Sequence, residues 1–173
     1  MVRRVRPLLS MLAALALLAP AAAHAAPASA PQPPAVQTQL LRSLTLYKDA
    51  DLEFGSVVAV GAGTAVIDPV SGNLTTTGGL VGLSGSSHPA RFSGAASGSS
   101  VVIIRIPNQP VTLTRVGGTE TVRVSSFTLD SPSKKEMAQS TTFEFRVGGT
   151  LTVPAGQVEG LYTGTFEVTV QYP

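Results

Sequence analysis

The chain has 173 residues, with 12 basic and 10 acidic side chains, two His, no Cys and no Trp. The absence of Cys excludes disulfide bonds, so burial and strand pairing must hold the fold. Because only two His are present, a zinc site built from Cys and His ligands is excluded as well.

The N-terminus predicts export. Arg3, Arg4 and Arg6 form a positive region, residues 8–19 form a short apolar run, and residues 23–25 offer an A-x-A cleavage site. We therefore expect a secretory signal peptide over residues 1–25 and an exported chain that is periplasmic, extracellular or on the cell surface. The run is short for a membrane span, so we expect no stable span in the mature chain.

Removal of that signal changes the charge. Three Arg leave with it, so 9 basic face 10 acidic residues and the net charge is −1. A nucleic-acid partner requires a basic face, and beyond Lys134 and Lys135 no basic cluster is present in the sequence. We read that pair as a solvated loop tip and expect no nucleic-acid partner.

Residues 26–39 are a Pro- and Ala-rich spacer, and residues 40–173 are predicted to form one β-domain. Its first strand is expected over residues 40–47. A turn at residues 49–51 then leads into a short strand over residues 52–55, which ends at a Gly.

A hairpin is predicted where residues 64–67 and 73–77 flank a turn that contains Asp68, Pro69 and Gly72. Further strands are expected over residues 89–95 and 101–106. The second of these is the most continuous apolar run outside the signal, which predicts a central strand that Pro107 ends.

Residues 111–114 and 121–130 predict two more strands. In the second strand, Val122 and Val124 are even-numbered, whereas Phe127 and Leu129 are odd-numbered. One extra residue at positions 125–126 restores a single apolar face, which predicts a β-bulge there. The polar connection that follows predicts a helical turn at residues 134–137.

Residues 143–153 contain Gly148 and Gly149 and allow two interpretations. A three-residue loop over residues 148–150 pairs Val147 with Leu151, which keeps the apolar rows aligned, and we favour it. The alternative is one bent strand with a glycine bulge.

The last predicted strand covers residues 161–172. Its apolar side chains share one parity and Thr, Glu and Gln occupy the other, as in a strand with one face on a core. The apolar row is Tyr162, Phe166, Val168, Val170 and Tyr172, with a gap at Gly164.

These segments give eight to ten short strands with turn signals every eight to twelve residues. That spacing predicts an all-β fold, a single antiparallel immunoglobulin-like β-sandwich of the pilin-like kind. We expect a core that includes Phe54, Phe92, Ile104, Phe145, Phe166 and Val168.

No sequence motif indicates catalysis, a cofactor or a metal. The predicted mature chain has one His, His88, and no nucleophile elbow surrounds the neighbouring Ser residues. Asp49, Asp51 and Glu53 alternate as in a loose calcium loop, but the ligand number and the turn Gly of such loops are not met. We interpret His88 as an exposed loop residue and the three carboxylates as a solvated turn, and we expect no enzyme.

Several stretches, in order, resemble the bacterial domain-of-unknown-function 4402 family (DUF4402). They are Leu-Glu-Phe-Gly at residues 52–55, Ala-Val-Ile-Asp-Pro at residues 65–69, Val-Gly-Gly-Thr-Leu at residues 147–151 and the closing strand. The resemblance covers roughly residues 44–172. It implies a fold and an exported location and assigns no activity.

The chain is distantly similar to spore-coat-U-like and chaperone–usher pilus subunits. Those also have an early Leu-x-Phe-Gly strand and end on a Gly-x-Tyr strand with alternating apolar residues. The similarity implies a fimbria-like assembly in which residues 36–46 would supply a donor strand.

Together these features predict a non-catalytic exported structural or surface protein, with a secreted binding module for polysaccharide or protein as the alternative. Exposed sheet edges with few charges suit pairing with a strand of another chain, either a second copy or a periplasmic chaperone. The predicted strand-pairing residues are Leu44, Leu46, Phe166, Val168, Val170 and Tyr172.

Overall fold

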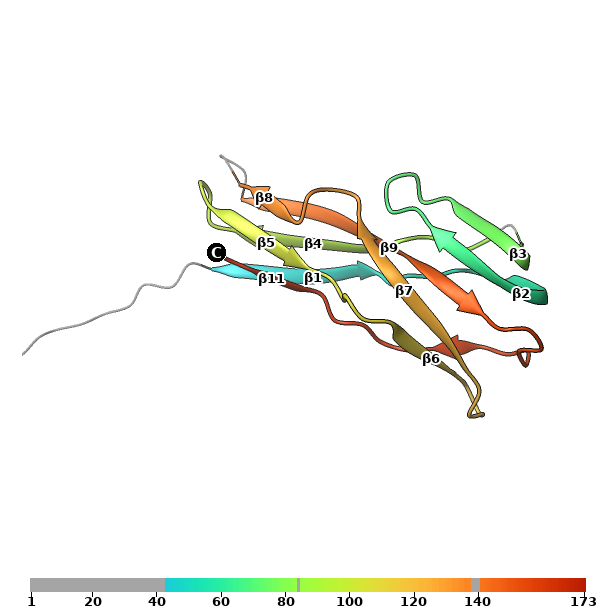
Figure 1. Cartoon of the computed structure of the whole chain (residues 1–173). Coiled ribbons are helices and arrows are strands. Elements are labelled where there is room, and N and C mark those ends of the chain that lie inside the picture. The colour runs from blue at the N-terminus through green and yellow to red at the C-terminus, as the bar shows by residue number, and fades with distance from the viewer. Residues whose placement is uncertain (1–42, 84, 138–140) are drawn as a thin grey trace, which may run out of the picture. The chain divides into compact units, whose positions relative to one another are not determined.

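The computed structural model describes residues 43–83, 85–137 and 141–173 (Figure 1). The predicted signal peptide and spacer lie outside the described residues. Within these ranges every regular element is a β-strand, and no helix has the length and apolarity needed to cross a membrane. The strands are β1 (Leu44–Ala50), β2 (Val57–Ile67), β3 (Leu74–Gly82), β4 (Ala90–Ala96), β5 (Val101–Arg105), β6 (Val111–Arg115), β7 (Thr121–Leu129), β8 (Lys134–Glu136), β9 (Thr142–Val153), β10 (Tyr162–Thr163) and β11 (Thr169–Gln171).

All strand pairs are antiparallel within the described chain, and they form two sheets. The larger sheet has eight strands, with β1-β4-β9-β7-β6-β10 in order and the β2–β3 hairpin attached to β9. The smaller sheet has the order β11-β5-β8. The prediction of an all-β antiparallel fold is confirmed, while the immunoglobulin-like assignment stays a prediction.

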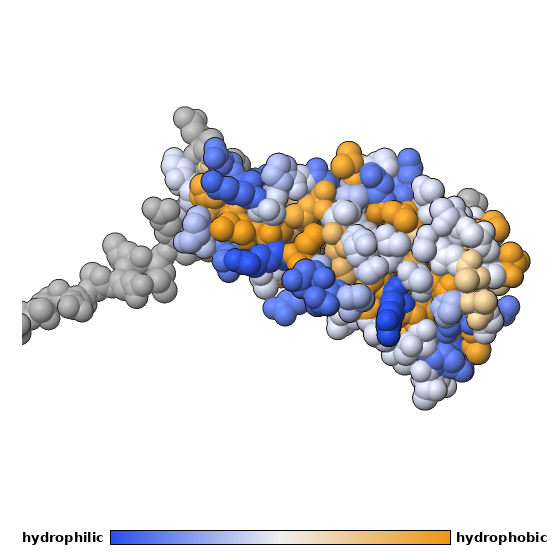
Figure 2. Space-filling model, in the orientation of Figure 1, coloured by the Kyte–Doolittle hydropathy of each residue, from blue (hydrophilic) through white to orange (hydrophobic). Residues whose placement is uncertain are grey.

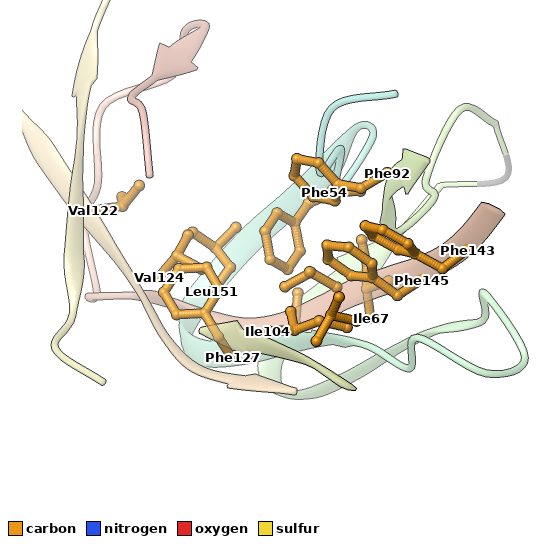
Figure 3. Close-up of a cluster of buried hydrophobic side chains, with 14 of the residues drawn as sticks. Phe54, Ile67, Phe92, Ile104, Val122, Val124, Phe127, Phe143, Phe145 and Leu151 are labelled. Carbon is orange, nitrogen blue, oxygen red and sulfur yellow. The ribbon is translucent and has the colours of Figure 1, made fainter. Parts of the chain in front are cut away.

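The core lies between apolar faces of both sheets (Figure 3). Phe145 of β9 is 1 % exposed, and its ring stacks on Phe92 of β4 with centroids 5.2 Å apart. Ile104, from the central strand of the smaller sheet, belongs to the same buried cluster. Of the six predicted core residues, four are buried, and Phe166 and Val168 are half-buried against the core.

Two local predictions are confirmed by the strand register. The hairpin of β2 and β3 turns at Asp68, whose carboxylate accepts hydrogen bonds from the backbone of Val70 and Ser71 and from the Ser71 hydroxyl. These bonds favour the charged form, so the pKa of Asp68 is lowered. The β7–β9 register shifts between Ser125 and Thr128, and Ser126 has φ +49°, so the β-bulge is present.

The favoured loop at residues 148–150 is wrong, because β9 continues through it as one strand that is twelve residues long. Gly148 pairs with Thr128 and Gly149 pairs with Ile67. A Cβ at Gly148 would meet Pro69 Cδ at 2.8 Å and the Ile67 carbonyl oxygen. The glycines therefore let the β2–β3 turn approach the strand, which is a packing role rather than a turn role.

Three other predictions need correction. Residues 134–137 form no helical turn, because β8 pairs with β5 there. Residues 52–55 contain an isolated bridge between Glu53 and His88 instead of a strand. The predicted turn at residues 49–51 begins later, since β1 extends to Ala50.

The last predicted strand is divided between the two sheets. β10 pairs with β6 in the larger sheet, and β11 pairs with β5 in the smaller one. At the crossing, a Cβ on Gly164 would lie 2.6 Å from Leu113 Cδ2 of β6, so the missing side chain permits close passage. The predicted parity holds throughout, because the apolar row is half-buried while Thr163, Thr165, Glu167, Thr169 and Gln171 are exposed.

Candidate strand-pairing surfaces

The six residues predicted for strand pairing lie on two edge strands and on the residues that flank one of them on either side. In the described chain, β1 pairs only with β4, and β11 pairs only with β5. All six side chains are half-buried and pack against the core: Leu44, Leu46, Phe166, Val168, Val170 and Tyr172. The outward row of each strand is exposed at Thr45 and Tyr47 and at Thr169 and Gln171.

The two edge strands lie beside one another (Figure 1). The Tyr172 hydroxyl donates to the Ser43 carbonyl at 2.7 Å and accepts from the Ser97 N–H at 2.9 Å. One phenol thus ties the C-terminal end to the start of β1 and to the loop between β4 and β5. The structure brings the N-terminal and C-terminal members of the predicted set to one side of the domain.

The two edges differ in charge. β11 has no charged residue, whereas β1 contains Lys48 and Asp49. Lys48 Nζ lies 2.6 Å from the Asp51 carboxylate, and Asp49 accepts a hydrogen bond from Ser93 at 3.0 Å. Natural edge strands use charge to discourage pairing, so β11 is the less protected of the two.

A further edge, at β3, was not found by the sequence reasoning. In the described residues β3 pairs only with β2, and its nine residues contain neither charge nor Pro. Between residues 57 and 82 Asp68 is the only charged side chain, and it sits in the turn. Four large hydrophobic side chains are exposed here: Val58 (45 %), Val60 (81 %) and Val81 (53 %) in the hairpin, and Leu83 (50 %) directly after it. Hydrophobic residues gather at this end of the surface in Figure 2.

Next to β3 is a hollow of about 350 Å³. Half-buried Leu74, Thr76 and Gly82 line one side, and residues of the following loop line the other: Leu83, Gly85 and Ser87. A Cβ at Gly82 would lie 2.8 Å from Leu74 Cδ2, so any side chain at this position would crowd the hollow. The sequence feature that could have revealed this surface is the stretch from residue 57 to residue 82, which has a single charged side chain.

His88 takes part in a polar cluster that fixes this loop. Glu53 accepts a hydrogen bond from the Ser86 hydroxyl at 2.8 Å, and its other oxygen lies 3.4 Å from His88 Nε2. The backbones of Glu53 and His88 also exchange hydrogen bonds of 3.0 and 2.8 Å. In a catalytic triad the imidazole lies between nucleophile and carboxylate, whereas here the carboxylate lies between Ser and His. The cluster anchors the loop and does not provide Ser86 with a base.

The three carboxylates that loosely suggested calcium have separate partners. Asp49 binds Ser93, Asp51 binds Lys48 and Glu53 binds Ser86. Over the described ranges no group of three or more His, Asp or Glu side chains could hold a metal ion. Lys135, which we read as part of a loop tip, instead lies in β8 and donates to the Glu144 carbonyl at 2.6 Å.

One ion pair has a strong electrostatic signature. Arg115 at the end of β6 donates to Glu120 through Nε at 2.7 Å and through a terminal nitrogen at 3.2 Å. Hydrogen bonding from Arg115 lowers the pKa of Glu120 to about 2 and raises the pKa of Arg115. The pair closes the β6–β7 turn and lies outside the β1, β3 and β11 edges, so we assign it a structural role.

A search of curated proteins and a search of solved structures each returned no match. These comparisons do not show the distant similarity to spore-coat-U-like subunits. A family model matches residues 44–172, from the start of β1 to Tyr172, under the description "Domain of unknown function (DUF4402)". The matched range is the β-domain described above, and the chain belongs to the DUF4402 family.

Proposed function

We propose that the protein is a non-catalytic structural subunit of an exported, fimbria-like or surface-attached assembly, in which copies of an immunoglobulin-like domain join by strand pairing. Support for export comes from the basic residues, the apolar run and the small-residue site of the first 25 residues. A periplasmic chaperone that covers the same edges before assembly is the expected transient partner.

The observation that supports this function best is the pair of neighbouring edges at β1 and β11. Each edge strand has backbone N–H and C=O groups directed away from its single partner strand, and such rows template the addition of another strand. The inward rows of both strands already pack on the core. An added strand would therefore continue an apolar face that β1 and β11 already pack against the core.

The test is the assembly state of residues 26–173. We expect ordered multimers on concentration, measured by size-exclusion chromatography with light scattering and by electron microscopy. Gln171→Lys puts a charge on the exposed row of β11 and should weaken assembly. Thr152→Lys is the matched control, because it adds the same charge to the outer face of central strand β9. A stable monomer at every concentration would contradict the proposal.

A binding module is the second candidate, and a row of Thr hydroxyls favours it. Register places Thr152 of β9, Thr64 of β2 and Thr77 of β3 side by side on the outer face. The Thr64 and Thr77 hydroxyls are hydrogen-bonded at 2.7 Å. Such a hydroxyl surface, which Arg123 of β7 flanks, could contact a polysaccharide. Glycan-array screening of residues 26–173 tests it: a specific hit that Thr152→Val abolishes would favour binding over assembly.

The non-catalytic part of the proposal has its own test. His88 contacts Glu53 and lies beside an exposed loop, so His88→Ala should leave the biological role of the protein intact. Loss of an assigned enzymatic activity in this variant, with the fold retained by circular dichroism, would show that the protein is an enzyme.

A further inference from the structure

We propose that the outer face of one end of the β2–β3 hairpin packs against the same face of a second copy. This end, the apolar arm, consists of residues 57–60 and 80–83 and lies beyond the part of β2 that pairs with β9. Hydrophobic residues gather at this end of the surface (Figure 2). The contact is face to face and uses no strand edge, so it goes beyond the strand pairing of the proposed function.

The apolar arm is folded back on the rest of the hairpin. A straight strand would separate Leu74 from Gly82 by about 26 Å. Instead, a Cβ at Gly82 would lie 2.8 Å from Leu74 Cδ2. The two strands come together where both have Gly, because a Cβ at Gly79 would lie 2.5 Å from the Gly61 Cα. The bend buries Leu80, which is 4 % exposed, and leaves the opposite face of the arm at the surface.

Both faces of the apolar arm are hydrophobic. Val58 and Val81 are register partners, and by alternation Val60 and Leu83 share their outer face. On the inner face, Val57 packs against the core. Strands that are apolar on both faces are typical of strands buried on both faces. The half of the hairpin beside β9 differs, because its outward row is mostly Thr. The outer face of the arm therefore has the composition of a covered surface, although it is exposed in the single chain.

The charge pattern indicates a second copy as the occupant. Residues 57–83 contain no Lys, Arg or aromatic residue, and Asp68 in the turn is their only charged side chain. A twofold contact places a patch against its own copy, so a charge in the patch would meet a like charge. A lipid surface is a poorer match, because interfacial segments attract anionic headgroups through Lys and Arg and are anchored by Trp and Tyr.

Four partly exposed side chains provide a small contact. The largest apolar patch of a typical monomer covers about 300–600 Å². A stable interface buries about 800 Å² on each partner. We therefore expect weak pairing between free chains, which becomes tight where an assembly holds many copies close together.

Cysteine cross-linking captures a weak twofold contact, and the chain has no Cys of its own. Val81→Cys in residues 26–173 places a thiol at the centre of the outer face, where a residue meets its own counterpart. On oxidation we expect disulfide homodimers to form at about tenfold the rate of Val116→Cys. Val116 is the matched control, because it lies in the β6–β7 turn and is 57 % exposed, against 53 % for Val81. Equal rates would overturn the inference.

A charge on the outer face tests whether the contact is apolar. Val60→Glu in the Val81→Cys chain should lower the cross-linking rate about tenfold while circular dichroism stays unchanged, because the contact would bury an unpaired charge. Val116→Glu in the same chain is the control and should leave the rate unchanged. Leu83→Glu, at a position outside β3, replaces Val60→Glu if that variant does not fold. A rate that the folded variant does not lower would overturn the inference.

Two further measurements separate this contact from its alternatives. Gln171→Lys at the β11 edge should leave the Val81→Cys rate unchanged, and a fall to the rate of Val116→Cys would overturn the inference. A chain that forms no multimers would contradict the proposed function, whereas rapid Val81→Cys cross-linking of that chain would still support this contact. Vesicles of phosphatidylethanolamine and phosphatidylglycerol are the lipid probe. Sedimentation with these vesicles that Val60→Glu abolishes, together with equal cross-linking rates, would assign the face to a membrane and overturn the inference.

Discussion

The Tyr172 hydroxyl connects the C-terminal segment to two other parts of the domain, and Tyr172→Phe removes that hydroxyl without changing the ring. The variant loses the 2.7 Å bond to the Ser43 carbonyl and the 2.9 Å bond from the Ser97 N–H. Each intramolecular hydrogen bond contributes roughly 0.5–1.5 kcal/mol net. Since both bonds lie in a half-exposed region where water can replace the lost partner, we expect the unfolding free energy to fall by about 1–2 kcal/mol in total.

The assay is urea and thermal denaturation of residues 26–173, followed by circular dichroism. For domains of about 150 residues, 1 kcal/mol corresponds to about 2–4 °C, so Tm should fall by about 2–8 °C. Tyr47→Phe is the matched control, because its ring is 64 % exposed. A Tyr172→Phe loss no larger than that of the control would refute the role of this hydroxyl in joining β11 to β1.

Three further predictions concern the core, the ion pair and the close approach at β9. In chemical denaturation, Phe145→Ala should lower the unfolding free energy by about 3–5 kcal/mol, because a fully buried, stacked ring is lost. The control Val60→Ala, at an 81 % exposed site, should change the unfolding free energy by less than about 0.5 kcal/mol. Because the pKa of Glu120 is depressed to about 2 in the folded state, its contribution to stability is present above the unfolded value of 4.5 and is lost as pH falls through that interval. The Tm difference between the parent and Glu120→Gln should therefore be present at neutral pH and vanish toward pH 2, and a constant difference would contradict the assignment. Gly148→Ala should cost about 1–3 kcal/mol because its Cβ would crowd Pro69 and Ile67, while Gly85→Ala, with open space around it, should be nearly neutral in the same denaturation assay.

The sequence predicted local structure correctly wherever residues close together in the chain determine that structure. The apolar row from Tyr162 to Tyr172 has the predicted parity, because strand alternation is a property of the backbone itself. The bulge at residues 125–126 followed from a switch in parity, and the turn at Asp68 followed from side-chain bonds to the adjacent backbone. These features depend on contacts within a few residues of sequence.

Tertiary structure decided what distant segments do to each other. Gly148 and Gly149 read as a loop, yet they lie inside β9 because the β2–β3 turn packs against them. The closing segment read as one strand, yet β6 and β5 capture its two halves in different sheets. The β3 edge was also hidden, because a strand becomes an edge only when no other segment pairs with it. Alternation fixes which face of a strand is apolar, but only the assembled sheets determine which backbone groups remain unpaired.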